Sequence, residues 1–227
     1  MKKKLMALGM ILVVMATLIT GCKIRNYDSA LIDINNGEDK ITLGYANFAF
    51  KYDQARYDVN YGSSYGSTMW SQDLTGSGST FADEVRDNVI DTLEEQYVIK
   101  KHADEYGVKL TDADTKAIDD ATTKFINGNS SAALNALGAD KDVVKEFLTD
   151  MTYVAKVEEA MIAKAKAAGE INDTTTSSTY VGNKVDEWKS KMEFKVDEDL
   201  KKQVRDYCYD KCYALAKSAK PKHEFLM

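Results

Sequence analysis

Proline is almost absent from this chain, and its absence limits the folds that the chain can adopt. The one proline among 227 residues, Pro221, lies close to the C-terminus. Folds built from many short strands need frequent turns, where proline is common, whereas proline breaks the interior of a helix. A chain without it can form long, uninterrupted helices. The sequence therefore predicts a mainly all-α protein.

Apolar residues recur at helical spacing through most of the sequence, and several helix starts are marked. Thr42 is placed to cap a helix over 43–61, and Thr80 and Thr111 each have an aspartate three residues later, as in a capping box. These two begin helices that we expect to end near Tyr106 and Asn127. Further helices are predicted over 130–137, 140–168, 183–192 and 197–219.

Two short segments look extended and interrupt the helical pattern. They are Lys40–Thr42 and Glu193–Val196, about 150 residues apart in the chain. An isolated strand leaves backbone hydrogen-bonding groups unsatisfied. We therefore expect the two segments to pair with each other, as a two-stranded ribbon that joins the ends of the domain.

The N-terminus indicates where the protein is located. Three lysines precede an apolar run that ends at the sequence Ile-Thr-Gly-Cys, with the cysteine at position 22. This pattern is typical of a bacterial lipoprotein signal peptide over residues 1–21. We expect Cys22 to carry the lipid and to hold the protein at the outer, extracytoplasmic face of the cell membrane. Residues 22–37 lack a clear period and are predicted to be a membrane tether.

The charge of the chain argues against nucleic acid as a partner. The formal net charge is −6, and loss of the lysine-containing signal peptide leaves −9. No basic cluster follows the signal peptide, and phosphate backbones bind basic surfaces.

Residues able to carry out chemistry are few. His102 and His223 have no partner at metal-ligand spacing, so we expect both to be solvated. Cys208 and Cys212 lie four residues apart on one helical face, a spacing that favours two small buried side chains over a disulfide or half of a metal site. No nucleotide-binding, nucleophile-elbow or zinc-protease motif occurs. The sequence thus predicts neither a catalytic residue, a metal nor a cofactor.

Three segments resemble the N-terminal domain of SurA/PrsA-type extracytoplasmic chaperones. They are ITLGYANFAFKYDQARY, FADEVRDNVIDTLEEQYVIKKHADEYGVKLTDAD and VVKEFLTDMTYVAKVEEAMI, and VDEWKSKMEFKVDEDL resembles the part that completes this domain. The resemblance implies a helical domain over 38–168 and 184–200. In that family a parvulin-type prolyl isomerase is commonly inserted between these two parts. Here only the polar residues 169–183 lie there, which is too short for a folded domain. The helix and tail over 201–227 have no assigned role.

The resemblance implies an ATP-independent chaperone, or holdase, that binds unfolded exported polypeptides and lacks prolyl isomerase activity. The predicted client-binding surface combines one apolar stripe of the helix over 43–61 with the Gly/Ser-rich loop over 62–79. Its residues are Phe50, Tyr57, Tyr61, Met69 and Trp70. The pattern leaves open that these side chains are ordinary core. A second hypothesis is a lipoprotein scaffold that binds one specific folded partner.

Overall fold

The computed structural model of the protein describes residues 27–172 and 175–205. Cys22, Cys208, Cys212 and His223 lie outside these ranges, so the predictions made for them are not addressed by the structure. Within the described ranges, no helix is both long and apolar enough to cross a bilayer.

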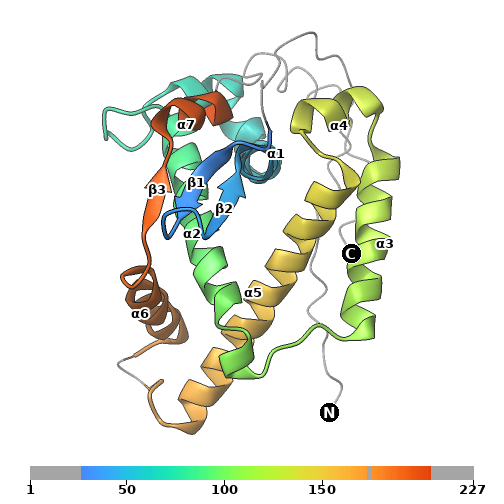
Figure 1. Ribbon diagram of the computed structural model, residues 1–227. Helices are drawn as coiled ribbons and strands as arrows, with labels where there is room; N and C mark the ends of the chain where they lie inside the picture. The colour runs from blue at the N-terminus through green and yellow to red at the C-terminus, as the bar shows by residue number, and fades with distance from the viewer. Residues whose placement is uncertain (1–26, 173–174, 206–227) are drawn as a thin grey trace.

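The described part of the chain is mainly helical, as predicted, and contains a small antiparallel sheet (Figure 1). The α-helices are α1 (Leu43–Tyr65), α2 (Phe81–Lys101), α3 (Asp112–Gly128), α4 (Ser131–Leu137), α5 (Lys141–Ala167), α6 (Ser177–Lys189) and α7 (Glu198–Arg205), and the strands are β1 (Ala30–Ile34), β2 (Asp39–Thr42) and β3 (Phe194–Val196). The long helices α2 and α5 pack against each other, α3 lies along α5, and α6 lies beside the lower parts of α2 and α5 (Figure 1).

The helix starts follow the local capping rules. The side chains of Thr80 and Thr111 accept hydrogen bonds from the backbone N–H groups of Asp83 and Asp114, each at 3.2 Å. Asp114 completes a capping box and also meets Lys156 of α5 at 2.6 Å. The hydrogen bond from Lys156, together with that from the Thr111 N–H, lowers the pKa of Asp114 to about 2. The cap of α3 thereby also joins α3 to α5.

The sheet differs from the predicted ribbon in its pairing. Its strand order is β2-β1-β3, so the two segments expected to pair with each other instead flank a third strand. Ile32 of β1 is opposite Ile41 on one side and Val196 on the other. The prediction of direct pairing is therefore wrong, although both segments belong to one sheet.

The central strand β1 lies inside the segment that was predicted to be a tether. Leu31, Ile32 and Ile34 are fully buried. Two adjacent buried residues break the alternation expected of a half-exposed strand, and the register shifts between Ala30 and Ile32. The assignment of 22–37 as a tether is consequently wrong for residues 30–34.

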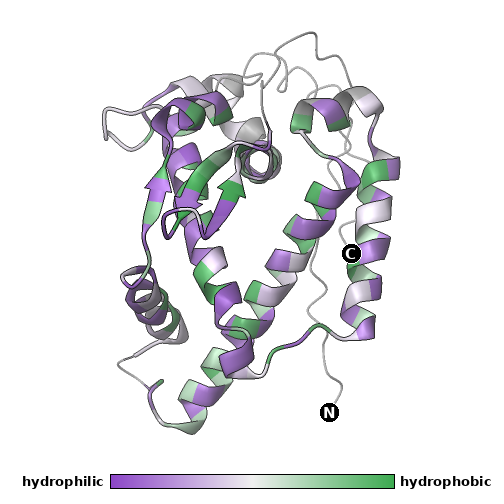
Figure 2. Ribbon diagram, viewed as in Figure 1, coloured by the Kyte–Doolittle hydropathy of each residue, from purple (hydrophilic) through white to green (hydrophobic). Residues whose placement is uncertain are grey.

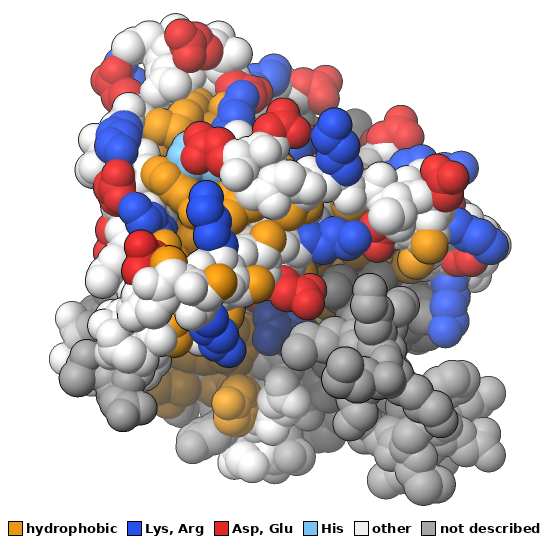
Figure 3. Space-filling model, turned by 90° about the horizontal axis from the view of Figure 1, so that it is seen from below, with side chains coloured by type: hydrophobic (Ala, Val, Ile, Leu, Met, Phe, Trp, Pro, Cys, Tyr) orange, Lys and Arg blue, Asp and Glu red, His pale blue; other side chains and the backbone are white. Residues whose placement is uncertain are grey.

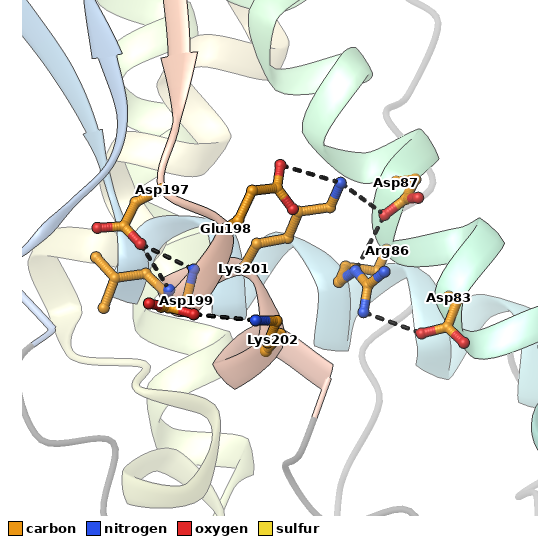
Figure 4. Close-up of polar contacts among 9 residues, drawn as sticks. Asp83, Arg86, Asp87, Asp197, Glu198, Asp199, Lys201 and Lys202 are labelled. Atoms are coloured by element: carbon orange, nitrogen blue, oxygen red, sulfur yellow. Dashed lines mark hydrogen bonds and ion pairs between the residues drawn. The ribbon is translucent and has the colours of Figure 1, made fainter.

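Helix α7, the last described helix, packs against α2 (Figure 4). Asp197 caps α7 by accepting the backbone N–H groups of Asp199 and Leu200 at 3.0 and 2.9 Å. Asp87 of α2 meets Arg86 at 3.0 Å and Lys201 of α7 at 3.3 Å. The side chain of Val204 is fully buried in the larger core. The segment 201–205, which the sequence left without a role, thus helps to close the domain.

Apolar side chains form two connected cores. The larger core surrounds α1 and the sheet, and Figure 2 shows hydrophobic residues gathered on β1, β2 and the facing sides of the long helices. The smaller core lies between α2, α5 and α6, with Val98, Val157, Met161, Val185 and Trp188 at its centre. It fixes α6 against the two long helices.

The polar segment between α5 and α6 is shorter than the predicted bridge over 169–183. Helix α6 already begins at Ser177, because the Thr176 side chain accepts the backbone N–H of Thr179 at 3.2 Å and caps it. Only residues 168–176 separate the two helices. This position therefore has even less room for an inserted domain than the sequence suggested.

Candidate functional site

Most of the predicted client-binding side chains are part of the core. The exposed fractions of Phe50, Met69 and Trp70 are 2%, 1% and 1%. The Trp70 indole donates a hydrogen bond to Asp58 at 2.9 Å, and its ring packs on Phe81 with the centroids 5.2 Å apart. Side chains this deeply buried offer no surface to a client. The predicted binding surface is therefore wrong for these three residues.

An exposed turn in the Gly/Ser-rich loop, after the buried Met69 and Trp70, is held by an aspartate. The carboxylate of Asp73 accepts backbone N–H groups from Thr75, Gly76, Ser77 and Gly78 at 2.7 to 3.3 Å. These hydrogen bonds, the one from Gly78 foremost, lower the pKa of Asp73. These hydrogen bonds close residues 73–78 into a local turn despite their Gly/Ser-rich composition.

Part of the predicted stripe does reach the surface. Tyr57 is half-buried, and Tyr61 is 49% exposed and stacks on it with a centroid distance of 6.0 Å. The other large hydrophobic side chain that is exposed in the described ranges is Leu74. Of the five predicted client-binding residues, only Tyr57 and Tyr61 thus keep surface that a client could contact.

A cleft lies instead on the far end of the fold, between α2, α5 and α6. Its volume is about 450 Å³. The apolar part of its lining is made by Ile99, Ile162, Val181 and Val185, with Gly182 among them, and the polar part by Glu95, Glu158, Asp186, Ser177 and Ser178. The cleft adjoins the smaller core, to which Ile99 and Val185 also belong.

Each long helix contributes the same pair of residue types to this cleft. Glu95 and Ile99 lie one turn apart on α2, and Glu158 and Ile162 lie one turn apart on α5. Residues four apart share a helix face, so each pair presents a carboxylate beside an apolar side chain. On α6, Asp186 follows Val185 directly, so this helix also contributes a carboxylate and an apolar side chain to the cleft.

The walls of the cleft are held in place by contacts just behind them. Trp188 of α6 is buried against His102, with ring centroids 3.9 Å apart, and Lys189 meets Glu94 of α2 at 2.9 Å. His102 is thus half-buried against an aromatic ring, and the prediction that it is solvated is wrong. Viewed from below, hydrophobic side chains gather among charged ones on this end of the molecule (Figure 3).

Gly182 lies in the interior of helix α6. Glycine in a helix interior costs about 0.5–1 kcal/mol relative to alanine. A Cβ atom built at Gly182 would meet nothing within 4 Å, so no close packing requires the missing side chain. The effect of this glycine is to leave the cleft open at α6.

Glu95 and Glu158 sit in an environment that disfavours their charge. Burial raises the pKa of Glu158, and the nearby Glu95 adds to the rise. Burial also raises the pKa of Glu95 in spite of the Lys189 ammonium, and carboxylates such as Asp186 add to it. Like charges close together in a partly desolvated site favour the approach of a cation.

The polar groups that line the cleft are three carboxylates and two serine hydroxyls. Ser177 and Ser178 are the hydroxyl-bearing residues in the cleft, and the residues that line it include no histidine, lysine or cysteine to activate them. Within the described residues, no group of three His, Cys, Asp or Glu side chains is arranged to hold a metal ion.

No family model, curated protein or solved structure matches this chain. The resemblance to SurA/PrsA-type chaperones thus stays a prediction from the sequence. None of the cleft residues was predicted as a site. The sequence signal that could have identified them is a carboxylate one helical turn before an isoleucine, which occurs in both α2 and α5.

Proposed function

We propose that this protein is a membrane-anchored, extracytoplasmic holdase that binds unfolded segments of exported polypeptides in the cleft between α2, α5 and α6. The observation that carries the proposal is an open cleft whose floor is apolar and whose rim is charged. Unfolded chains expose apolar side chains that folded proteins bury. A cleft of about 450 Å³ lies within the range of roughly 300–1,000 Å³ that pockets for small ligands occupy, so it suits a few side chains of an extended segment.

The connection between α5 and α6 supports holding without isomerisation. Residues 168–176 occupy the position where SurA/PrsA-type proteins commonly carry a parvulin domain, and a folded domain needs at least about 50 residues. The cleft lies directly beside this connection, since Ser177 and Ser178 at the start of α6 line it.

The position of Tyr27, at the start of the described fold, supports a location of the domain close to the membrane. The carbonyl of Tyr27 accepts the backbone N–H of Gly44 at 2.9 Å, and its ring lies against Gly138, where a Cβ would come within 2.8 Å of it. Tyr27 is therefore fixed in the fold. Five residue steps from Cys22 reach at most about 18 Å, so a lipid on Cys22 would hold the domain next to the bilayer.

Lipidation at Cys22 has a direct test. Replacing Cys22 by Ala should move the protein from the membrane fraction to the soluble fraction, or leave its signal peptide uncleaved, because the lipid and the processing both need this thiol. Cell fractionation and the mass of the mature protein measure both outcomes, with Cys208→Ala as the matched control. A Cys22→Ala protein that is still cleaved before residue 22 and still lipidated would contradict the assignment.

Holdase action is tested with the full-length protein in lipid vesicles and a chemically unfolded client. We expect the protein to suppress aggregation of several unrelated clients at near-stoichiometric amounts without ATP, because the cleft recognises exposed apolar chain rather than one shape. Light scattering measures this. If no client is protected at a several-fold excess, the proposal is wrong, and saturable binding of one folded partner would favour the scaffold hypothesis instead.

A further inference from the structure

We infer that the cleft between α2, α5 and α6 selects unfolded segments in which a lysine or arginine lies beside apolar residues. This inference rests on the proposed holdase function and names the class of segment that the cleft accepts. It follows from the charges that surround the apolar floor.

The residues that line the cleft bring three acidic side chains and no basic one. Glu95, Glu158 and Asp186 come from three different helices, and the lining holds no lysine or arginine. No ion pair or hydrogen bond joins the side chains of these three carboxylates to another group in the described part of the chain. Lys189 of α6 pairs with Glu94 at 2.9 Å, and its charge also acts on Glu95.

Acidic side chains elsewhere in the fold pair with lysines of the protein itself. Asp114 meets Lys156 at 2.6 Å, and Glu187, one residue after Asp186, meets Lys184 and Lys191 at 2.9 and 2.7 Å. The fold therefore pairs its carboxylates in many places, whereas no ion pair forms at the three carboxylates of the cleft in the described part of the chain, and Lys189, which pairs with Glu94, acts on Glu95 only through its charge. Burial and, after it, repulsion by Glu95 raise the pKa of Glu158, and a cation that enters the cleft would offset this repulsion.

Lysine and arginine fit both parts of the cleft at once. Their aliphatic stems cover apolar surface while the charged group stays at the polar edge. In the cleft a stem would lie over Ile99 and Ile162, and the charge would reach Glu95 or Glu158, one helical turn away. An apolar neighbour in the same segment would contact Val181 and Val185. A segment with a glutamate in place of the lysine would be repelled.

The inference is tested with three fluorescent peptides of about ten residues, long enough to cross the cleft when extended. They share an apolar sequence and differ at one central position, which is Lys, Gln or Glu. Binding to the full-length protein is measured by fluorescence anisotropy. We expect the Lys peptide to bind about five- to tenfold more tightly than the Glu peptide, with the Gln peptide between them, and the difference to shrink at high salt.

Two variants assign the preference to the cleft. Glu158→Gln should reduce the affinity for the Lys peptide about threefold or more and leave that for the Gln peptide nearly unchanged. Glu159→Gln, which removes the same charge from the next, exposed residue of α5, should change neither affinity. Asp186→Asn provides a second variant on another helix, and circular dichroism confirms that each variant is folded.

The outcomes separate this inference from the proposed function. Equal binding of all three peptides, or equal effects of Glu158→Gln and Glu159→Gln, would overturn the selection of basic segments and leave the holdase proposal standing. Failure of every peptide to bind, together with failure to suppress aggregation, would overturn both.

Discussion

A chain that ends at Met192 is expected to be largely unfolded at physiological temperature. A chain that ends at Arg205 keeps the complete sheet and provides the reference. The difference between the two is residues 193–205, which hold β3 and α7. The effect should reach the whole domain, because these elements complete structures that begin at the N-terminal end of the fold.

Two kinds of contact are lost in the shorter chain. Strand β3 pairs with β1, and the backbone N–H of Asn35 donates to the carbonyl of Glu193 at 2.8 Å. Val204 is fully buried, and Phe194, Val196 and Leu200 pack against the larger core. Burying an apolar side chain completely contributes about 1.5–3 kcal/mol, so one full and three partial burials amount to about 5 kcal/mol. The stability of a whole domain is only about 5–15 kcal/mol.

The ion pairs that join α7 to α2 add little to this loss. Lys201 meets Asp87, and Asp87 is half-exposed, so the pair contributes at most about 1 kcal/mol (Figure 4). Replacing Lys201 by Ala in the full-length chain should therefore leave the sheet intact, which separates loss of charge from loss of packing.

Thermal unfolding followed by circular dichroism measures the effect of the truncation, and amide hydrogen exchange shows where it reaches. We expect exchange protection to fall in β1 and α1 as well as near the new C-terminus. The same midpoint in both truncated chains, or a loss of protection confined to α6, would contradict the role assigned to β3 and α7.

The helices could be predicted from the sequence because their ends depend on neighbouring residues. Thr80 and Thr111 each accept the backbone N–H of the residue three positions later, and at Thr111 the Asp114 side chain completes a capping box. Strand β1 could not be predicted in the same way. Leu31 and Ile32 are both buried because β1 is the central strand and the register shifts beside it, so the alternation that identifies a strand is missing.

The site was harder to predict than the fold, since it depends on contacts between distant residues. The stripe with Phe50 was correctly identified as apolar, but only the packing around α1 decides whether such a stripe is covered. Trp70 lies in a Gly/Ser-rich loop that looks flexible from its composition, and its burial depends on contacts with Asp58 of α1 and Phe81 of α2. The cleft combines residues of three helices between positions 95 and 186, and no local pattern shows that these faces meet.

Filling the cleft with a side chain is expected to abolish holdase action. Gly182 lies among the apolar residues of the lining, and a side chain at this position has open space. Tryptophan there would occupy the cleft. Replacing a glycine in a helix interior also favours the helix by a few tenths of a kcal/mol or more, so we expect about the same or a higher melting temperature.

The measurement that tests this account most directly is aggregation suppression by Gly182→Trp beside Asn183→Trp, both as full-length proteins in lipid vesicles. Asn183 is the next residue of α6 and is exposed outside the cleft, so its variant carries the same added indole without filling the site. The account predicts that Gly182→Trp is folded and no longer protects clients, while Asn183→Trp protects them as the wild-type protein does. A folded Gly182→Trp variant that suppresses aggregation as well as Asn183→Trp would contradict the central claim that the cleft holds the client.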